Sequence, residues 1–530
     1  MTTPTGVPWS RISMRPSAAC GPCSRTEGST CAVVCSSRCP LSSVLPLPGG
    51  LCPAASRYRD RMTATPASDG SPSITWVVTT EAEPWVSKQA PALGAPTGMP
   101  DIILRTDAPQ QPIEGFGASF NELGWTSLAA LSQADRDEVM RELFAPGVGA
   151  NLGLCRMPLG ANDFSRDWYS YDEVDGDFAL EHFSIEHDHE TLVPFIRAAR
   201  QHQPELRLWA SPWSPPTWMK TNGHYAAAMP HLAFSTVENG LKPEQVGHEG
   251  TDMFVQDDAY LAAYAEYFGR FIDAYRELGI PIGMVMPQNE FNSAQVFPSC
   301  TWTPEGLARF LRHLGPAMAE RDVEVFLGTL ERADDTMVTA VLGDEIAAPF
   351  VRGVGAQWHG KGAVPFLHHD HPELRLYQTE QECGDGRNDW RFARYAWTLM
   401  KHFFDNGARA YMYWNISLAA GGVSRWGWAQ NSLVTVRAGD DAEAATFTWN
   451  HEYYLLKHVS HFVQAGAHVV KALSYTGWEN ELVFVNPDGS TVIVIHNDSA
   501  VEQTLNILVG DAVFAPTLPA DSFSTFILSA

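Results

Sequence analysis

Eight short apolar runs alternate with segments of helical periodicity through the middle of this 530-residue chain. Because parallel strands need a long crossover connection, a regular alternation of strands and helices predicts an α/β fold with a parallel sheet. Eight such units over roughly 300 residues fit a (β/α)8 TIM barrel with some loop insertions. The predicted strands end at Phe120, Gly160, Trp213, Glu290, Leu330, His359, Glu380 and Asn415.

Helical periodicity is clearest from Asp258 to Leu278, where apolar side chains fall on one stripe and Gly279 follows as a stop signal. This pattern predicts a helix with one buried face. Further helices are predicted at residues 133–144, 192–202, 304–319, 390–404 and 450–464.

The last part of the chain has alternating β-type runs with no helix between them. This pattern predicts an antiparallel β-sandwich over residues 465–530, which strands from residues 73–110 complete. The barrel is then assigned to residues 111–464. The C-terminal runs are residues 469–473, 482–485, 492–496, 505–508 and 523–528.

Residues 1–72 differ in composition from the rest, since six of the nine cysteines fall in the first 52 residues, among many Ser, Pro and Arg. A Cys-x-x-Cys pair at Cys20 and Cys23 lacks a second pair at zinc-site spacing. We predict a disordered or non-native extension, with translation starting at Met62. No secretion signal is recognisable, and the remaining cysteines are dispersed, which together favour the reducing cytoplasm.

The overall charge narrows the classes of partner. A hydrophobic content of 45% with 18% charged residues is typical of a globular protein, and the net charge of -25 argues against nucleic-acid binding. No apolar run of about 18 or more residues occurs, so we expect no integral membrane span. Nothing in the sequence specifies an oligomeric state.

Glu290 and Glu380 are the leading catalytic candidates, because they close the fourth and seventh predicted strands and so lie across the barrel mouth from each other. Retaining glycoside hydrolysis needs a protonated carboxyl and an ionised carboxylate about 5 to 5.5 Å apart. A lone glutamate is more often a surface carboxylate, but two at matched strand ends favour paired chemistry. Glu382 would share the face of Glu380 if that strand continued, although the Cys383-Gly384 sequence indicates that it ends.

Aromatic residues are concentrated near the same predicted strand ends, beside several polar groups. A single Trp is more often core than ligand platform, but this concentration favours a pocket that binds sugars through flat apolar faces and hydroxyl-binding groups. The aromatics are Trp209, Trp213, Trp218, Trp302, Trp358, Trp414, Trp426 and Trp428, and the polar residues are Asp163, His359, Asn415 and Asn431.

A set of motifs from about Gln111 to the C-terminus resembles glycoside hydrolase family 30, which includes the glucosylceramidases. The most specific motif is Ala-Ser-Pro-Trp-Ser-Pro-Pro-Thr-Trp-Met-Lys-Thr-Asn-Gly at residues 210–223. Shorter matches follow in the family's order, at residues 114–120, 162–165, 169–172, 288–290, 357–359, 379–380, 413–415 and 426–431.

The resemblance implies a (β/α)8 barrel with a β-sandwich built from both chain ends, and a retaining mechanism without cofactor or metal. It implies that Glu290 is the acid/base, Glu380 the nucleophile, and Asn289 the partner of the sugar 2-hydroxyl. The expected substrate is a β-linked glucoside, with β-1,6-glucan, β-xylosides and β-fucosides as alternatives within the family. By position, the implied sugar-binding residues are Asp163, Trp213, Asn289 and Trp414, with His359 and Asn431 as contributors.

Two positions depart from the family pattern. Phe291 follows the acid/base where Pro is usual, and Gly360 follows His359 where an aromatic is common in glucosylceramidases, so the aglycone wall is expected to differ. Two other classes are also considered. The His368-His369-Asp370-His371 sequence, with His187 and His189 as further candidate ligands, suggests a metal-assisted hydrolase, although a solvated turn between strands six and seven explains it better. A catalytically inactive carbohydrate-binding protein would not need both carboxylates.

Overall fold

The computed structural model describes residues 73–232, 235–439 and 444–529. The predicted N-terminal extension, with its Cys-x-x-Cys pair and the expected start at Met62, lies outside the described residues. None of the described helices is long and apolar enough to cross a membrane.

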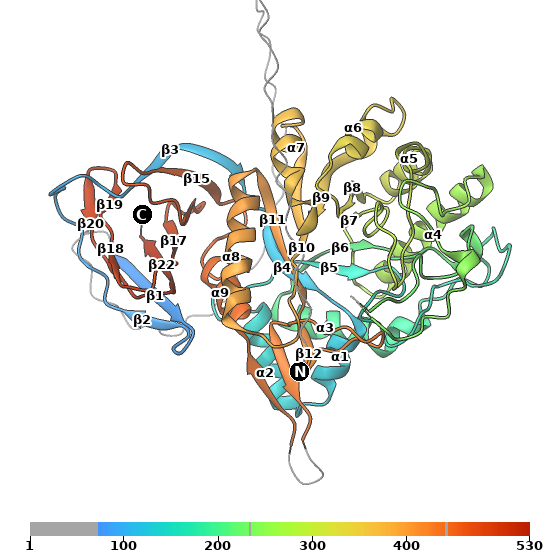
Figure 1. Cartoon of the computed structure of the whole chain (residues 1–530), viewed down its shortest axis with the longest axis horizontal. Coiled ribbons are helices and arrows are strands. Elements are labelled where there is room, and N and C mark those ends of the chain that lie inside the picture. The colour runs from blue at the N-terminus through green and yellow to red at the C-terminus, as the bar shows by residue number, and fades with distance from the viewer. Residues whose placement is uncertain (1–72, 233–234, 440–443, 530) are drawn as a thin grey trace, which may run out of the picture. The chain divides into compact units, whose positions relative to one another are not determined.

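Eight parallel strands close into a barrel in the described chain, which confirms the predicted (β/α)8 architecture (Figure 1). Each strand pairs with the next one in sequence, and β11 closes the ring by pairing with β4. The strands are β4 (Gly115–Ser119), β5 (Leu154–Pro158), β6 (Arg207–Ser211), β7 (Met284–Val285), β8 (Glu324–Leu330), β9 (Val351–Gln357), β10 (Arg375–Glu380) and β11 (Ala408–Asn415).

Strand β7 is shorter than predicted, because regular pairing stops at Val285 instead of continuing to Glu290. Pro287 follows almost at once and has no N–H to donate to a neighbouring strand. The backbone still bonds to the barrel wall, since the Met286 N–H donates to the Ala210 carbonyl at 2.9 Å. The chain therefore reaches the C-terminal rim as irregular backbone.

Five of the six predicted helices begin and end within one residue of their predicted positions, and the sixth ends early, at Ser460. Three further α-helices among the described residues were not predicted, and several helices have a side-chain N-cap. Asn121, Ser132, Asp257 and Thr303 each accept a hydrogen bond from a backbone N–H in the first helical turn. The helices are α1 (Glu122–Ala129), α2 (Gln133–Phe144), α3 (Leu192–His202), α4 (Asp258–Glu277), α5 (Pro304–Ala319), α6 (Thr336–Leu342), α7 (Val364–Asp370), α8 (Trp390–Asp405) and α9 (His451–Ser460).

The histidine-rich segment before β10 is mostly helical, so its prediction as a turn was wrong. Helix α7 includes His368 and His369, and Pro365 stands at its first turn, where a missing N–H costs nothing. No group of three or more His, Cys, Asp or Glu side chains with a metal-binding arrangement occurs among the described residues.

Buried, mostly apolar side chains fill the barrel interior beneath the rim and pack against one another. Gly117 on β4 is required by this packing, because a Cβ there would lie 1.7 Å from the Leu154 carbonyl oxygen of β5. The interior cluster consists of Leu154, Trp209, Met284, Met286, Phe326, Tyr377, Ala410 and Met412.

The β-sandwich is built from both ends of the described chain, as predicted. In Figure 1 the blue strands β1 (Ile74–Thr80), β2 (Val86–Lys88) and β3 (Ile102–Pro112) lie among the red C-terminal strands. The strand order is β2-β1-β22-β17-β16-β15-β3-β19-β20, and all pairs are antiparallel except β3 with β19. The C-terminal strands are β15 (His468–Leu473), β16 (Glu481–Val485), β17 (Thr491–Asn497), β18 (Gln503–Thr504), β19 (Ile507–Val509), β20 (Ala512–Phe514), β21 (Thr517–Leu518) and β22 (Ser522–Leu528).

A small sheet after β11 was not predicted from the sequence. It contains β12 (Ser417–Ala419), β13 (Val434–Arg437) and β14 (Thr446–Trp449). These strands are three or four residues long, too short to give a clear period-two pattern. The sheet follows directly on the strand that ends at Asn415.

Candidate active site

Two carboxylates and one amide lie at the C-terminal rim of the barrel, where the active sites of this architecture are found. Asn289 and Glu290 follow β7, and Glu380 is the last residue of β10. Glu290 and Glu380 are both buried, each with 8% of its surface exposed. The structure links Asn289 to Glu380 through shared hydrogen-bond donors on two other strands.

Arg156 on β5 is the first shared donor, and sequence reasoning missed it. Its guanidinium donates through Nη1 to Glu380 Oε2 at 2.6 Å, and through Nη2 to Asn289 Oδ1 at 2.6 Å and Ser211 Oγ at 3.0 Å. The Arg156 side chain is completely buried. A buried charge persists only when it is paired and hydrogen-bonded, so Arg156 and Glu380 stabilise each other.

Gln357 at the end of β9 is the second shared donor. Its Nε2 lies 2.8 Å from Asn289 Oδ1 and 3.0 Å from Glu380 Oε2. The Thr329 hydroxyl also donates to Asn289 Oδ1, at 3.0 Å. These bonds use the oxygen of the Asn289 amide and none uses Nδ2, so the donor end of the side chain remains for another partner.

Glu290 is held differently, and it has no ion pair of its own among the described residues. Its backbone adopts the left-handed conformation, with φ 49°, and its N–H donates to Thr329 Oγ1 at 3.0 Å. Its Oε2 accepts a hydrogen bond from Gln295 Nε2 at 2.9 Å. Burial and the nearby negative charge of Glu380 raise the pKa of Glu290 to about 8.

The two carboxyl groups therefore have unequal tendencies to ionise. Burial raises the pKa of Glu380 also, but the charge and the hydrogen bond of Arg156 act in the opposite direction. The guanidinium contacts Glu380 and not Glu290, so the shared negative charge is better stabilised on Glu380. Such a separation between two neighbouring carboxyls is what assigns acid and anion roles in paired-carboxylate chemistry.

Aromatic faces and an unpartnered carboxyl adjoin the charged centre. The rings of Trp213 and Trp414 are stacked with centroids 5.3 Å apart, and the Arg156 guanidinium lies 4.2 Å from the Trp213 ring centroid. Asp163 Oδ1 and Trp414 Nε1 are buried and have no hydrogen-bond partner among the described residues. Burial, together with the charges of Glu380 and Glu290, raises the pKa of Asp163 well above its usual value. A buried acceptor and donor next to aromatic faces fit a ligand that carries hydroxyl groups.

A sequence profile described as "Glycosyl hydrolase family 30 TIM-barrel domain" matches residues 113–233 and 237–463. The chain belongs to glycoside hydrolase family 30. A second profile, for the β-sandwich domain of the same family, matches residues 482–526. The protein is therefore a glycosidase, and the family inferred from its sequence motifs is confirmed.

Individual relatives of this family 30 enzyme are named for different activities. It is 27% identical to the lysosomal acid glucosylceramidase of Mus musculus, over 80% of this chain and 83% of that protein. It is 28% identical to an endo-1,6-β-D-glucanase of Aspergillus fumigatus, over 79% of this chain and 85% of that protein. The fold also resembles the crystal structure of SrfJ from Salmonella typhimurium, with a TM-score of 0.75 and 24% identity over 86% of this chain and all of that one.

The two remaining predicted sugar-binding residues have protein partners in this family 30 structure. His359 is exposed, its Nδ1 lies 2.9 Å from Glu331 Oε1, and its ring stacks on Trp358 with centroids 5.1 Å apart. Asn431 is buried, and its Nδ2 donates to Glu452 Oε1 at 2.9 Å while its Oδ1 accepts the Gly386 N–H at 2.9 Å. The amide oxygen of Asn431 thus holds the loop after β10, and its Nδ2 is used by Glu452 on α9.

Two aromatic residues expected at the rim belong to the core instead. Trp209 lies in the barrel interior, and Trp302 stacks against Phe254 and Phe310 with centroids 4.9 and 5.4 Å apart. The position of an aromatic residue near a strand end does not show whether its ring lines the pocket or packs in the core.

The two departures from the family pattern have structural explanations. Phe291 is fully buried in the main hydrophobic cluster, so its side chain does not form the aglycone wall. A Cβ at Gly360 would lie 2.5 Å from the Leu330 carbonyl oxygen, so this backbone leaves no space for a larger side chain at this position.

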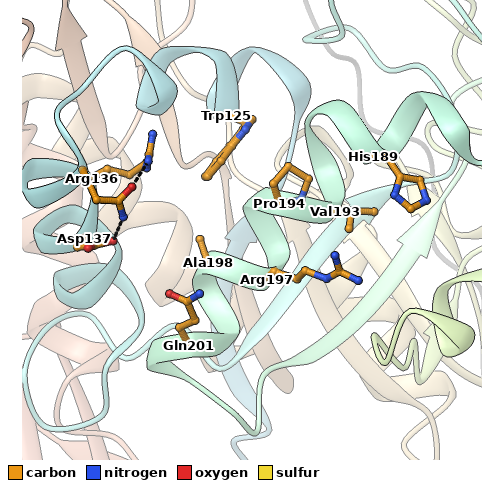
Figure 2. A pocket seen from close by; sticks show the side chains of 10 residues that line it. Trp125, Arg136, Asp137, His189, Val193, Pro194, Arg197, Ala198 and Gln201 are labelled. Atoms are coloured by element: carbon orange, nitrogen blue, oxygen red, sulfur yellow. Dashed lines mark hydrogen bonds between the residues drawn. The ribbon is translucent and has the colours of Figure 1, made fainter.

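A surface pocket outside the barrel is separate from this site. It has a volume of about 320 Å³ and contains none of the residues at the rim (Figure 2). Its polar groups partly satisfy one another, because Gln133 bonds to both Arg136 and Asp137. It is lined by Trp125, Gln133, Arg136, Asp137, His189, Val193, Pro194, Arg197, Ala198 and Gln201.

Proposed function

We propose that this family 30 enzyme hydrolyses β-linked glucosides with retention of configuration, with Glu380 as nucleophile and Glu290 as acid/base. One observation carries the proposal. Arg156 donates to Glu380 at 2.6 Å, whereas burial and the charge of Glu380 raise the pKa of Glu290 to about 8. One carboxyl is thereby suited to attack and the other to protonate.

The proposed reaction has two displacements. Glu290 gives its proton to the glycosidic oxygen while Glu380 attacks the anomeric carbon, so the aglycone leaves as an alcohol and a covalent glucosyl-enzyme forms. Glu290, now ionised, takes a proton from water, and the resulting hydroxide equivalent releases Glu380 and glucose. Asn289, with its Oδ1 fixed by Arg156 and Gln357, presents Nδ2 to the sugar 2-hydroxyl.

The pH profile of kcat/KM should show this division of roles. For phenyl β-glucoside, kcat/KM is expected to fall as pH rises through about 8, because only protonated Glu290 assists a poor leaving group. In Glu290→Gln assayed with dinitrophenyl β-glucoside, whose departure needs no acid, this basic limb should be absent. A basic limb that persists in Glu290→Gln would assign it to another group.

The proposed substrate preference is based on the activities of the relatives and on the residues around the two carboxylates. A glucosylceramidase-like exo-β-glucosidase is the first candidate, because Asp163, Trp213 and Trp414 lie around the carboxylates. An endo-β-1,6-glucanase is the second, because the Aspergillus relative with that activity is matched equally well.

A panel of substrates separates these candidates. We expect aryl β-glucoside to be turned over roughly 10- to 100-fold faster than aryl β-xyloside, which lacks the hydroxymethyl group. Glucosylceramide and β-1,6-glucan should be compared by product analysis, since free glucose indicates exo action and mixed oligosaccharides indicate endo action. Absence of turnover on every substrate would contradict the proposal and favour a carbohydrate-binding protein.

A further inference from the structure

The loop between Glu290 and α5 folds back so that one of its side chains contacts the carboxyl of Glu290. Gln295 Nε2 lies 2.9 Å from Glu290 Oε2 and 2.6 Å from Ser293 Oγ. Its two N–H groups therefore have two acceptors, one of which is the carboxyl oxygen.

The backbone of Gln295 is fixed independently of this contact. Its carbonyl accepts the Ala227 and Ala228 N–H groups at 2.9 and 2.8 Å, and its own N–H donates to Ser299 Oγ at 3.2 Å. The loop is also anchored by buried Lys220, whose Nζ donates to the Ser299 carbonyl at 2.7 Å. A carboxamide on so constrained a backbone can hold its partner in one rotamer.

We infer that Gln295 is a positioning residue that fixes the carboxyl of Glu290 and directs its proton to Oε1. The inference rests on the proposed function, because it takes Glu290 as the acid/base. An N–H that donates to Oε2 occupies an acceptor site on that oxygen, so the neutral carboxyl carries its proton on the other oxygen. The same N–H also stabilises the carboxylate that must accept a proton from water in the second displacement.

Loss of this donor should raise the pKa of Glu290, because a hydrogen bond to the carboxylate favours the ionised form. The other charged groups that act on Glu290 are Glu380, Arg332, Arg156 and Asp163. These groups are unchanged when Gln295 is replaced, so a shift of the basic limb reports the lost hydrogen bond.

The test compares Gln295→Leu and Gln295→Glu with the parent enzyme on phenyl and dinitrophenyl β-glucosides. In Gln295→Leu we expect kcat/KM for phenyl β-glucoside to fall about 10- to 100-fold, since a misplaced acid loses most of its effect. For dinitrophenyl β-glucoside the fall should be under about threefold, because that leaving group needs no proton. The basic limb should move up by about one pH unit in Gln295→Leu, and further in Gln295→Glu, which adds a like charge at nearly constant shape.

Ser299→Ala is the matched control. It removes the hydroxyl that holds the Gln295 backbone but keeps the carboxamide, so a purely structural role would give both variants the same behaviour. The Ala227 and Ala228 N–H groups still hold the Gln295 carbonyl in Ser299→Ala, so we expect this variant to keep the parent's basic limb and the parent's ratio of rates on the two substrates. An unshifted limb and an unchanged ratio in Gln295→Leu would overturn the inference while the proposed function stands. A parent enzyme inactive on both substrates would overturn the proposed function and the inference with it.

Discussion

Glu380→Ala is expected to lower kcat/KM for dinitrophenyl β-glucoside by on the order of 10⁴-fold or more, the scale seen when a catalytic nucleophile is removed. Added azide is expected to restore turnover and to give the α-glucosyl azide, because the small anion enters the space left by the carboxylate and attacks from the same face. In Glu290→Ala, azide should instead replace water in the second displacement and give the β-glucosyl azide. Product configuration, measured by NMR, thus assigns both roles in one experiment.

Glu382→Ala is the control for this assignment. Glu382 lies two residues beyond Glu380 and is partly exposed, and its carboxylate lies beside the hydroxyl of Tyr395. We expect this variant to retain the parent's activity and to give no azide product. Formation of the α-glucosyl azide by Glu382→Ala, but not by Glu380→Ala, would show that Glu382 is the nucleophile instead of Glu380.

Most of the fold follows from local sequence patterns. Strands and helices alternate with the periodicities of a (β/α)8 barrel, and the capped helices begin where the sequence signals indicate. The predictions of strands were wrong where the local sequence pattern does not determine which segments pair in the folded protein. The chain before Glu290 is apolar enough to be a strand, but Pro287 interrupts its ladder, and the short strands of the sheet after β11 are defined only by their partners.

The site was predictable only in part, for a similar reason. Strand position predicted that Glu290 and Glu380 lie at one rim, because the C-terminal ends of parallel strands meet there, and the structure has both buried at that rim. Arg156 stands inside an apolar strand, and that buried charge was the available signal, but its partners Asn289 and Glu380 are 133 and 224 residues away. Hydrophobic periodicity shows that such a residue is buried, and it carries no information about which acceptors it meets.

Arg156→Met is expected to lower the free energy of unfolding by about 3 to 5 kcal/mol at neutral pH, because it leaves the buried carboxylate of Glu380 without its partner. The comparison with Arg156→Lys is informative. An ammonium group lacks the planar fork that reaches Glu380, Asn289 and Ser211 together, so we expect only partial recovery of stability and of kcat/KM.

The pH dependence of this loss identifies its cause. Without Arg156 the pKa of Glu380 in the folded protein rises further above the unfolded value of about 4.3. The folded state then binds more protons than the unfolded state, so the deficit relative to the parent should be small near pH 4 and should grow as pH rises toward the folded pKa. Chemical denaturation of parent and variant at about pH 4.5 and about pH 7.5, which roughly span that window, measures the difference.

The double variant Arg156→Met/Glu380→Gln shows whether the loss of stability comes from the unpaired charge of Glu380 or from lost packing around Arg156. If the uncompensated carboxylate causes the loss, neutralising it should restore most of the stability and remove the dependence on pH, although activity stays absent. If the double variant is as unstable as Arg156→Met, the loss comes instead from the contacts between the guanidinium and the rings of Trp213 and Trp414. In that case Arg156 supports the aromatic wall of the site more than it stabilises the nucleophile.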